Sequence, residues 1–150
     1  MKKFIISLII ATIALAASAQ SEFFKACEKI PDITTVYISK AMMSLIGSVD
    51  LKCDGVDLSG IASKVDNIEI IQGEDKAAKP LAEKVRSLIK SGYENLMRIK
   101  DEEEIVALYM RKLSPKKFEY VLTTDEDDES TVIIFTGELT IAEVLAATGH

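Results

Sequence analysis

The hydrophobic period of this chain changes at Gly92, and that change constrains the fold more than any other feature. Before it, Leu81, Val85, Leu88 and Ile89 share the spacing of one helix face. After Gly92, apolar and polar residues alternate, which predicts β-strands. The strand segments are 93–100, 105–112, 117–123 and 131–136.

Short connections join these strand segments, at 101–104, 113–116 and 125–130. Strands joined by hairpin-sized connections lie side by side in antiparallel order. The apolar strand faces need cover, which the helix at 81–89 and a last helix, opened by the capping box of Thr140 and Glu143, can supply. The predicted fold class is α+β: a mainly antiparallel sheet with a C-terminal four-stranded meander and helices packed on one face.

Alternation within the strands also predicts which side chains point at the long helix. Leu108 and Ile134 are expected to face the helix that carries Val85 and Leu88. Arg111 falls on the other face of its strand and is expected to be a plain surface residue.

The N-terminal half predicts fewer regular elements. Ser39 can cap the helix that follows the first strand. The expected elements are a short helix at 21–29, a strand at 34–38, a helix after Ser39, a loop at 47–60 that contains Cys53, and a strand at 65–71.

The first 19 residues have the pattern of a signal peptide. Lys2 and Lys3 precede an uncharged run at 4–16, and Ala17-Ser18-Ala19 provides the small residues of a cleavage site. The run is shorter than the ~20 apolar residues that a membrane span needs. We expect cleavage after Ala19, a single domain at 20–150, and a periplasmic or secreted product.

Removal of the leader makes the chain strongly acidic. It takes away two of the 18 basic residues and none of the 24 acidic ones, which leaves a net charge of −8. Nucleic acid and anionic lipid would repel such a chain. The expected partner is a protein or another envelope component, with no nucleic acid and no stable membrane insertion.

The two cysteines leave two alternatives open. In an oxidising compartment Cys27 and Cys53 could form a disulfide. They could equally be reduced, buried thiols that behave as small hydrophobic side chains. Their spacing does not decide between these states.

An acidic segment at 125–130 is the one candidate for a cation site. Asp125, Asp127 and Glu129 alternate as calcium ligands do in an EF-hand loop. Ser130 replaces the required glycine, and Thr136 stands where the bidentate glutamate should be. We therefore expect a solvated hairpin turn, with a weak calcium site as the alternative, and no cofactor.

Catalytic motifs are sparse. The only histidine is His150, so histidine-based triads and histidine-ligated zinc are excluded. Two Ser-x-x-Lys matches lack the companion motifs of acyl enzymes; they are Ser87 with Lys90 and Ser114 with Lys117. The expected function is non-catalytic binding, and the alternative is a small histidine-independent hydrolase that uses carboxylates or a Ser/Lys pair.

Three blocks of the chain resemble a known family: TTVYISKAMMSLIG, GYENLMRIKDEEEIVALYMRK and STVIIFTGELTIAEV. Together they resemble the exported proteins grouped as domain of unknown function 4252, small envelope proteins and lipoproteins of Gram-negative bacteria. The resemblance implies an α+β envelope domain with no assigned activity and no catalytic residues to carry over. Unlike the lipoprotein members, this sequence has no lipid-accepting cysteine, because the residues before Cys27 are Phe24-Lys25-Ala26.

Overall fold

The structure is a computed structural model that describes residues 21–46, 52–53, 56–57 and 61–147. The leader and His150 lie outside the described residues, so the signal peptide stays a prediction. Within the described ranges, no helix is long and apolar enough to cross a membrane.

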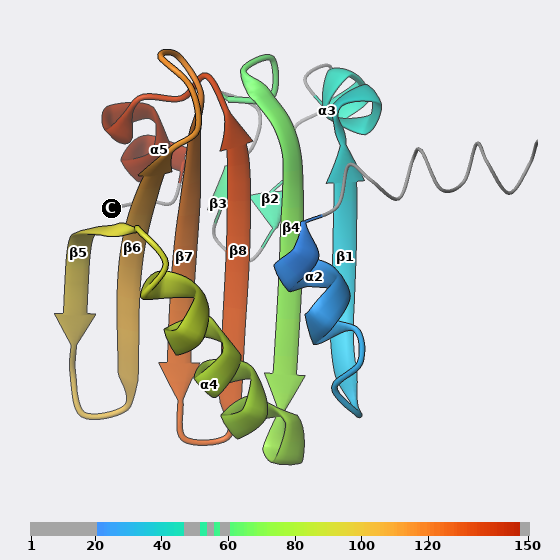
Figure 1. The fold of residues 1–150 in the computed structure, drawn as a ribbon, viewed down its shortest axis with the longest axis vertical. Helices are drawn as coiled ribbons and strands as arrows, with labels where there is room; N and C mark the ends of the chain where they lie inside the picture. Colours follow the sequence, from blue (N-terminus) through green and yellow to red (C-terminus); the bar gives the residue numbers. More distant parts are fainter. Residues whose placement is uncertain (1–20, 47–51, 54–55, 58–60, 148–150) are drawn as a thin grey trace, which may run out of the picture.

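A six-stranded antiparallel sheet forms the centre of the molecule, in the order β1-β4-β8-β7-β6-β5 (Figure 1). A separate two-stranded hairpin, β2–β3, lies behind it in that view. The elements are α2 (Glu22–Cys27), β1 (Ile33–Ser39), α3 (Lys40–Ile46), β2 (Lys52–Cys53), β3 (Val56–Asp57), β4 (Val65–Glu74), the 3-10 turn η1 (Asp75–Ala77), α4 (Ala78–Ile89), β5 (Glu94–Lys100), β6 (Glu104–Lys112), β7 (Phe118–Glu126), β8 (Glu129–Gly137) and α5 (Ile141–Ala147).

The α+β class and the C-terminal meander are confirmed. Strands β5 to β8 pair in sequence order, as their short connections predicted. Strand β8 then pairs with β4, and β4 with β1, so the two halves of the chain share one sheet.

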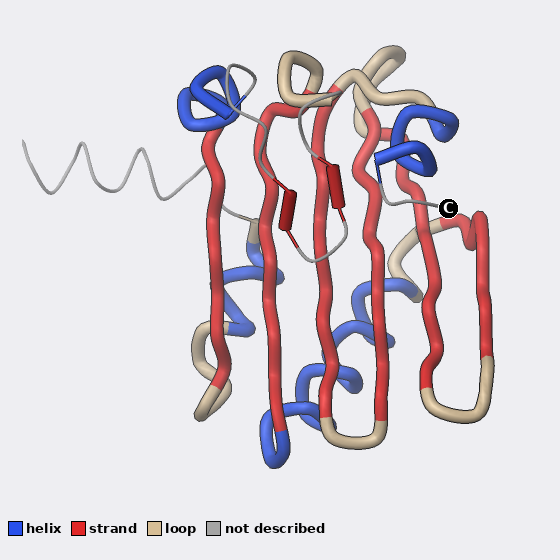
Figure 2. Tube along the Cα trace, turned by 180° about the vertical axis from the view of Figure 1, so that it is seen from behind, coloured by secondary structure: helices blue, strands red, loops and turns tan. Residues whose placement is uncertain are grey.

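Side chains on the two faces of the sheet form two hydrophobic cores. We call the face covered by α2 and α4 the helix face, and the opposite one the hairpin face (Figures 1 and 2). The helix-face core contains Phe24, Cys27, Ile71, Leu81, Val85, Val121, Val132 and Ile134. The hairpin-face core contains Met43, Ile61, Ala62, Val65, Ile68, Val106, Leu108, Tyr120, Leu122, Phe135, Leu139, Val144 and Ala147.

The predicted orientation of β6 is wrong, whereas that of Ile134 is confirmed. Leu108 is fully buried but belongs to the hairpin-face core, and Arg111 lies on the helix face instead. Strand β6 has apolar residues on both faces, with Ala107 and Tyr109 alternating with Leu108. The pattern therefore predicted a buried strand but carried no information on which face the long helix covers.

The last helix also lies on a different face from the one expected. Val144 of α5 packs into the hairpin-face core, so helices cover both faces of the sheet. The capping box at its start is confirmed: the Thr140 N–H donates to Glu143 at 2.9 Å, and the Glu143 N–H donates to Thr140 Oγ1 at 3.3 Å. The two hydrogen bonds of this capping box join residues three apart in the chain, which is why the sequence predicts them.

Several boundaries differ from those predicted. Strand β4 continues to Glu74, and the segment expected to be a loop at 47–60 contains the β2–β3 hairpin. The turn between β7 and β8 is shorter than the predicted 125–130, because pairing continues as far as Asp125 with Ser130. Gly92 ends the long helix region with a φ of 102°, a conformation that favours glycine.

Candidate functional site

The outer edge of β1 is the most distinctive surface of the described chain. Strand β1 is the first in the sheet order, and no described strand pairs with its outer side. Its seven residues, ITTVYIS, carry no charge and no proline, and they pair with β4 without a bulge. Edge strands usually carry a charge, a proline or a bulge that blocks pairing with another chain. Strand β1 has none of these.

The other edge strand of the sheet, β5, has features that disfavour pairing with another chain. Strand β5 carries Glu94, Arg98 and Lys100 within seven residues. Its pairing with β6 is interrupted by a register shift between Asn95 and Met97. Charges and bulges both disfavour strand addition, so the two edges of one sheet differ in their capacity to pair.

Exposed apolar side chains lie beside the β1 edge. Val36 in β1 is 43% exposed, and Met42 and Leu45 in α3 are 50% and 65% exposed. Helix α3 follows β1 directly because Ser39 Oγ accepts a hydrogen bond from the Met42 N–H at 3.3 Å. Met43 is fully buried and anchors the helix to the hairpin-face core. An apolar surface next to an unprotected edge is typical of a protein-binding site.

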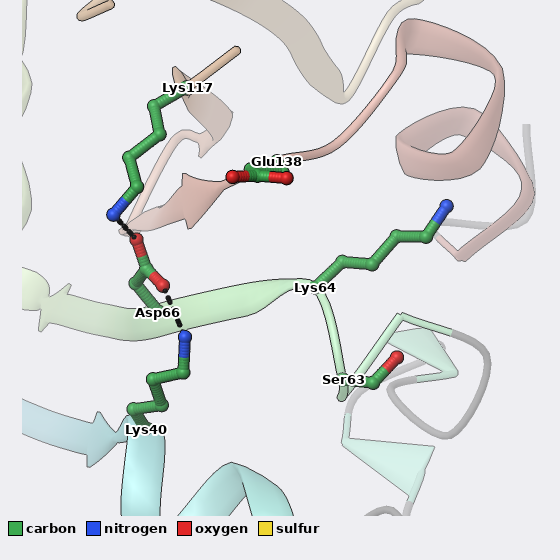
Figure 3. A pocket seen from close by; sticks show the side chains of 6 residues that line it. All are labelled: Lys40, Ser63, Lys64, Asp66, Lys117 and Glu138. Atoms are coloured by element: carbon green, nitrogen blue, oxygen red, sulfur yellow. Dashed lines mark hydrogen bonds and ion pairs between the residues drawn. The ribbon is translucent and has the colours of Figure 1, made fainter.

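A polar pocket of about 380 Å³ opens where β4 begins and β8 ends (Figure 3). It is lined by Lys40, Ser63, Lys64, Asp66, Lys117 and Glu138. The register shift between Val65 and Asn67 makes Asp66 the extra residue of a bulge, a feature that can re-aim a side chain. Figure 3 shows the Asp66 carboxylate between Lys117 and Lys40, at 2.7 and 3.0 Å.

Four of the five charged side chains that line this pocket form ion pairs. Burial raises the pKa of the Asp66 carboxyl, but the hydrogen bonds from Lys117 and Lys40 outweigh burial and hold that pKa below its ordinary value. Lys64 pairs with Glu143 of the last helix. Exposed ion pairs of this kind contribute little to stability. Glu138 lines the pocket without an ion pair among the described residues.

Gly137, the last residue of β8, lies against the backbone of Lys64. A Cβ atom there would lie 2.2 Å from the Lys64 carbonyl oxygen, so only glycine lets the two backbones approach. The next residue uses this approach, because the Glu138 N–H donates to Lys64 O at 3.1 Å.

Two acidic side chains, Glu69 and Glu119, are buried on the helix face. Glu69 of β4 is only 2% exposed, and its carboxylate accepts hydrogen bonds from Ser21 N–H at 3.0 Å and Ser21 Oγ at 3.1 Å. Burial raises the pKa of Glu69; the Ser21 hydrogen bonds partly offset this, and the nearby Glu119 adds to it. The carboxylate thus attaches α2 to β4, an inner strand of the sheet.

Glu119 of β7 is the other buried acid on the helix face. It accepts a hydrogen bond from the Tyr93 hydroxyl and pairs with Arg111 Nη2 at 3.3 Å. The Arg111 guanidinium lies over the Tyr93 ring, 4.7 Å from its centroid. Burial and the bond to Glu119 raise the pKa of the Tyr93 hydroxyl. Both buried acids therefore have partners within the protein.

The acidic segment does not assemble as one site. Asp125 lies in β7 and accepts a bond from Ser130 Oγ at 2.6 Å, whereas Glu129 lies in β8 and accepts from Gln72 Nε2 at 2.6 Å. Strand alternation directs Asp125 to the helix face and Glu129 to the hairpin face. Asp127 is in the turn. Among the described residues, no three His, Cys, Asp or Glu side chains group as metal ligands.

The serine–lysine matches have local structural roles. Ser87 Oγ donates to the Glu83 carbonyl within α4 at 3.3 Å. Ser114 Oγ accepts from the Lys117 N–H at 3.2 Å, while Lys117 Nζ bonds to Asp66. Neither serine bonds to a lysine side chain in the part of the chain that the structure describes.

Cys27 is a buried, free thiol in α2, on the helix face. Burial raises the pKa of this thiol to about 11. Cys53 lies in β2, over the other face, and its side chain is outside the described residues (Figure 2). The disulfide and the pair of reduced thiols stay alternative predictions.

In a comparison with protein families, residues 24–146 match "Domain of unknown function (DUF4252)". The chain belongs to this family. The resemblance drawn from the sequence is thus confirmed, and the DUF4252 match includes every strand of the central sheet. No curated protein and no solved structure matches the chain. The DUF4252 description names no activity, so function rests on the surfaces described above.

Sequence reasoning missed the importance of β1, Glu69 and Glu119. The signal for the acids was a single charged residue within an apolar segment, IEII or FEYVL, which alternation treats as solvent-facing. The signal for β1 was a strand without charge, but its position at an edge depends on pairing with β4.

Proposed function

We propose that this chain is a non-catalytic binding domain of the cell envelope that recognises a protein partner by strand addition to β1. The observation that carries the proposal is the uncharged, bulge-free outer edge of β1. Main-chain hydrogen bonds along such an edge provide affinity, and neighbouring apolar side chains provide specificity. Val36, Met42 and Leu45 would supply these contacts.

Export is part of the same proposal and rests on the leader at 1–19. The processed chain is expected to begin at Gln20 and to carry no lipid. The intact mass of the exported form tests this. A different start, or the added mass of a diacylglycerol group, contradicts it.

The alternative of a histidine-independent hydrolase has weaker support. Its carboxylates would be Glu69 and Glu119, but each is engaged by an internal donor. In the polar pocket the Asp66 carboxylate is paired with Lys40 and Lys117, and neither Ser-x-x-Lys serine bonds to a described lysine side chain.

Binding can be tested by cross-linked pull-down from envelope extract with the processed protein. Val36→Lys places a charge at the middle of β1, on a side chain that is already exposed. Ile99→Lys makes the same change on β5, where Ile99 is 45% exposed, and is the matched control. We expect Val36→Lys to lose the captured partner and Ile99→Lys to retain it. Equal recovery with all three proteins would contradict the proposal.

A further inference from the structure

We infer that the partner at the β1 edge is a second copy of this chain, which adds its own β1 in antiparallel order. This inference rests on the proposed function, because it names the occupant of that edge. Two sheets joined in this way form one continuous sheet across a two-fold axis. Both copies then use the same surface, as in most symmetric dimers.

One register pairs all seven residues of β1 with those of its copy. In it, Val36 lies opposite Val36 of the second copy on the two-fold axis. Thr35 lies opposite Tyr37, Thr34 opposite Ile38, and Ile33 opposite Ser39. Each of these pairs lies on one face of the sheet. A shift in either direction leaves at least one strand residue unpaired.

The same register brings opposite charges together at both ends of the strand. Asp32, just before β1, lies opposite Lys40 of the second copy, just after β1. The symmetry repeats this pair at the other end. Both residues are exposed in the single chain, where Lys40 Nζ also lies 3.0 Å from Asp66 Oδ1, so Asp32 of the second copy would be a further carboxylate for this lysine. Strand β1 has no charge of its own, so nothing within it repels its copy.

The exposed side chains of β1 are those that this register covers. Thr34 and Val36 are the two exposed residues of the strand, and both lie on the hairpin face. Pairing places Val36 against its own copy and Thr34 against Ile38. Cross-strand contacts between β-branched side chains stabilise a sheet, so the pairing covers surface that the single chain exposes.

The test measures the mass of the processed protein in solution across a range of concentrations. We expect a concentration-dependent dimer. Val36→Lys would put two lysines face to face on the axis and weaken the dimer about tenfold or more. Ile99→Lys, on the other edge of the sheet, should leave the dimer unchanged. Thermal unfolding of each variant establishes that the fold is intact.

A milder variant and a cross-link test the register itself. Asp32→Asn suits the positive φ of 61° at this position and removes both end pairs, so the dimer should weaken about twofold to fivefold at low salt. A zero-length carbodiimide cross-link should join Asp32 of a heavy-isotope chain to Lys40 of a light one. Within one chain these residues lie at opposite ends of β1, too far apart for that link.

The outcomes separate this inference from the proposed function. A protein that stays monomeric at every concentration, or a dimer weakened by Ile99→Lys rather than Val36→Lys, overturns the second-copy inference. A monomer whose capture of another protein still depends on Val36 overturns it too, while strand addition at β1 stands. Mixed-isotope linkage of Asp32 to Lys40, lost in Val36→Lys, supports it.

Discussion

Glu69 accepts both the backbone N–H and the hydroxyl of Ser21, at 3.0 and 3.1 Å, in a position where its carboxylate is almost inaccessible to solvent. Ser21 Oγ also accepts from the Phe24 N–H at 3.1 Å and so caps α2. One serine therefore begins the first helix and attaches it to β4. Without Ser21, the described structure gives this buried acid no other hydrogen-bond donor.

Ser21→Ala removes the helix cap and one of the two donors to Glu69. We expect the free energy of unfolding to fall by about 0.5–2 kcal/mol, the usual cost of losing such a cap. Urea denaturation measures it. Ser87→Ala, an exposed helical serine, is the control and should change stability little. Equal effects of the two substitutions would argue against the Ser21–Glu69 attachment.

The pH dependence of stability should report on Glu69. Its pKa in the folded state is raised above 4.5, chiefly by burial, so the folded protein binds more protons there than the unfolded chain. The contribution of this group to stability is complete below pH 4.5 and is lost as pH rises through the folded pKa. Glu69→Gln lacks this loss, so it should gain stability relative to the natural protein as pH rises above 4.5. Parallel curves of stability against pH for the two proteins would contradict the raised pKa.

Cys27 should be inert to thiol reagents in the folded protein. It is inaccessible, and its pKa of about 11 leaves little thiolate at neutral pH. Labelling followed by peptide mass spectrometry should modify Cys27 only in denaturant. Because the folded pKa exceeds the ordinary 9.0, stability should also fall as pH rises from 9 towards 11, and Cys27→Ala should lack that fall. An intact mass short of two hydrogens would instead reveal a disulfide with Cys53.

Because the two cores lie on opposite faces of the sheet, substitutions in different cores should have additive effects on the free energy of unfolding. Leu108→Ala should cost about 2–5 kcal/mol, because a fully buried leucine is truncated. In the double variant that also carries Val85→Ala, on the helix face, the costs of the two substitutions should add within about 0.5 kcal/mol. Val85→Ala with Ile134→Val, both in the helix-face core, should deviate more. Urea denaturation of the single and double variants provides both cycles. Strong coupling of Leu108 with Val85 would mean that the faces are wrongly assigned.

Arg111→Ala should destabilise the protein more than a surface substitution does. It leaves the Glu119 carboxylate, buried on the helix face, without its cation, which we expect to cost about 1–3 kcal/mol. Arg98→Ala on β5 is the matched control, since Arg98 is exposed and should change stability by less than about 0.5 kcal/mol. Indistinguishable unfolding curves for the two variants would restore Arg111 to the surface role expected from the sequence.

Calcium should leave the melting temperature unchanged. Asp125 and Glu129 point to opposite faces of the β7–β8 hairpin, so they and Asp127 do not surround one ion. A cation bound only by the folded state would raise stability by mass action. A rise of several degrees at millimolar calcium, abolished by Asp127→Asn, would establish a site at this turn.

Local sequence determined most of the secondary structure. The stripe from Leu81 to Ile89, the capping box at Thr140 and the alternation after Gly92 each act over a few residues, and each predicted the right element. Short connections then implied the order of β5 to β8. These features depend on neighbours along the chain, which is why a single sequence reveals them.

Tertiary structure decided what alternation leaves open. Strand β6 has apolar side chains on both faces, and only packing shows that Leu108 meets the hairpin face and Arg111 the helix face. The pairing of β1 with β4, which leaves β1 at an edge, joins segments separated by a helix and a hairpin. Burial of Glu69 likewise depends on Ser21, 48 residues away. Contacts between distant segments make the candidate binding edge and the buried acids, and no local pattern contains them.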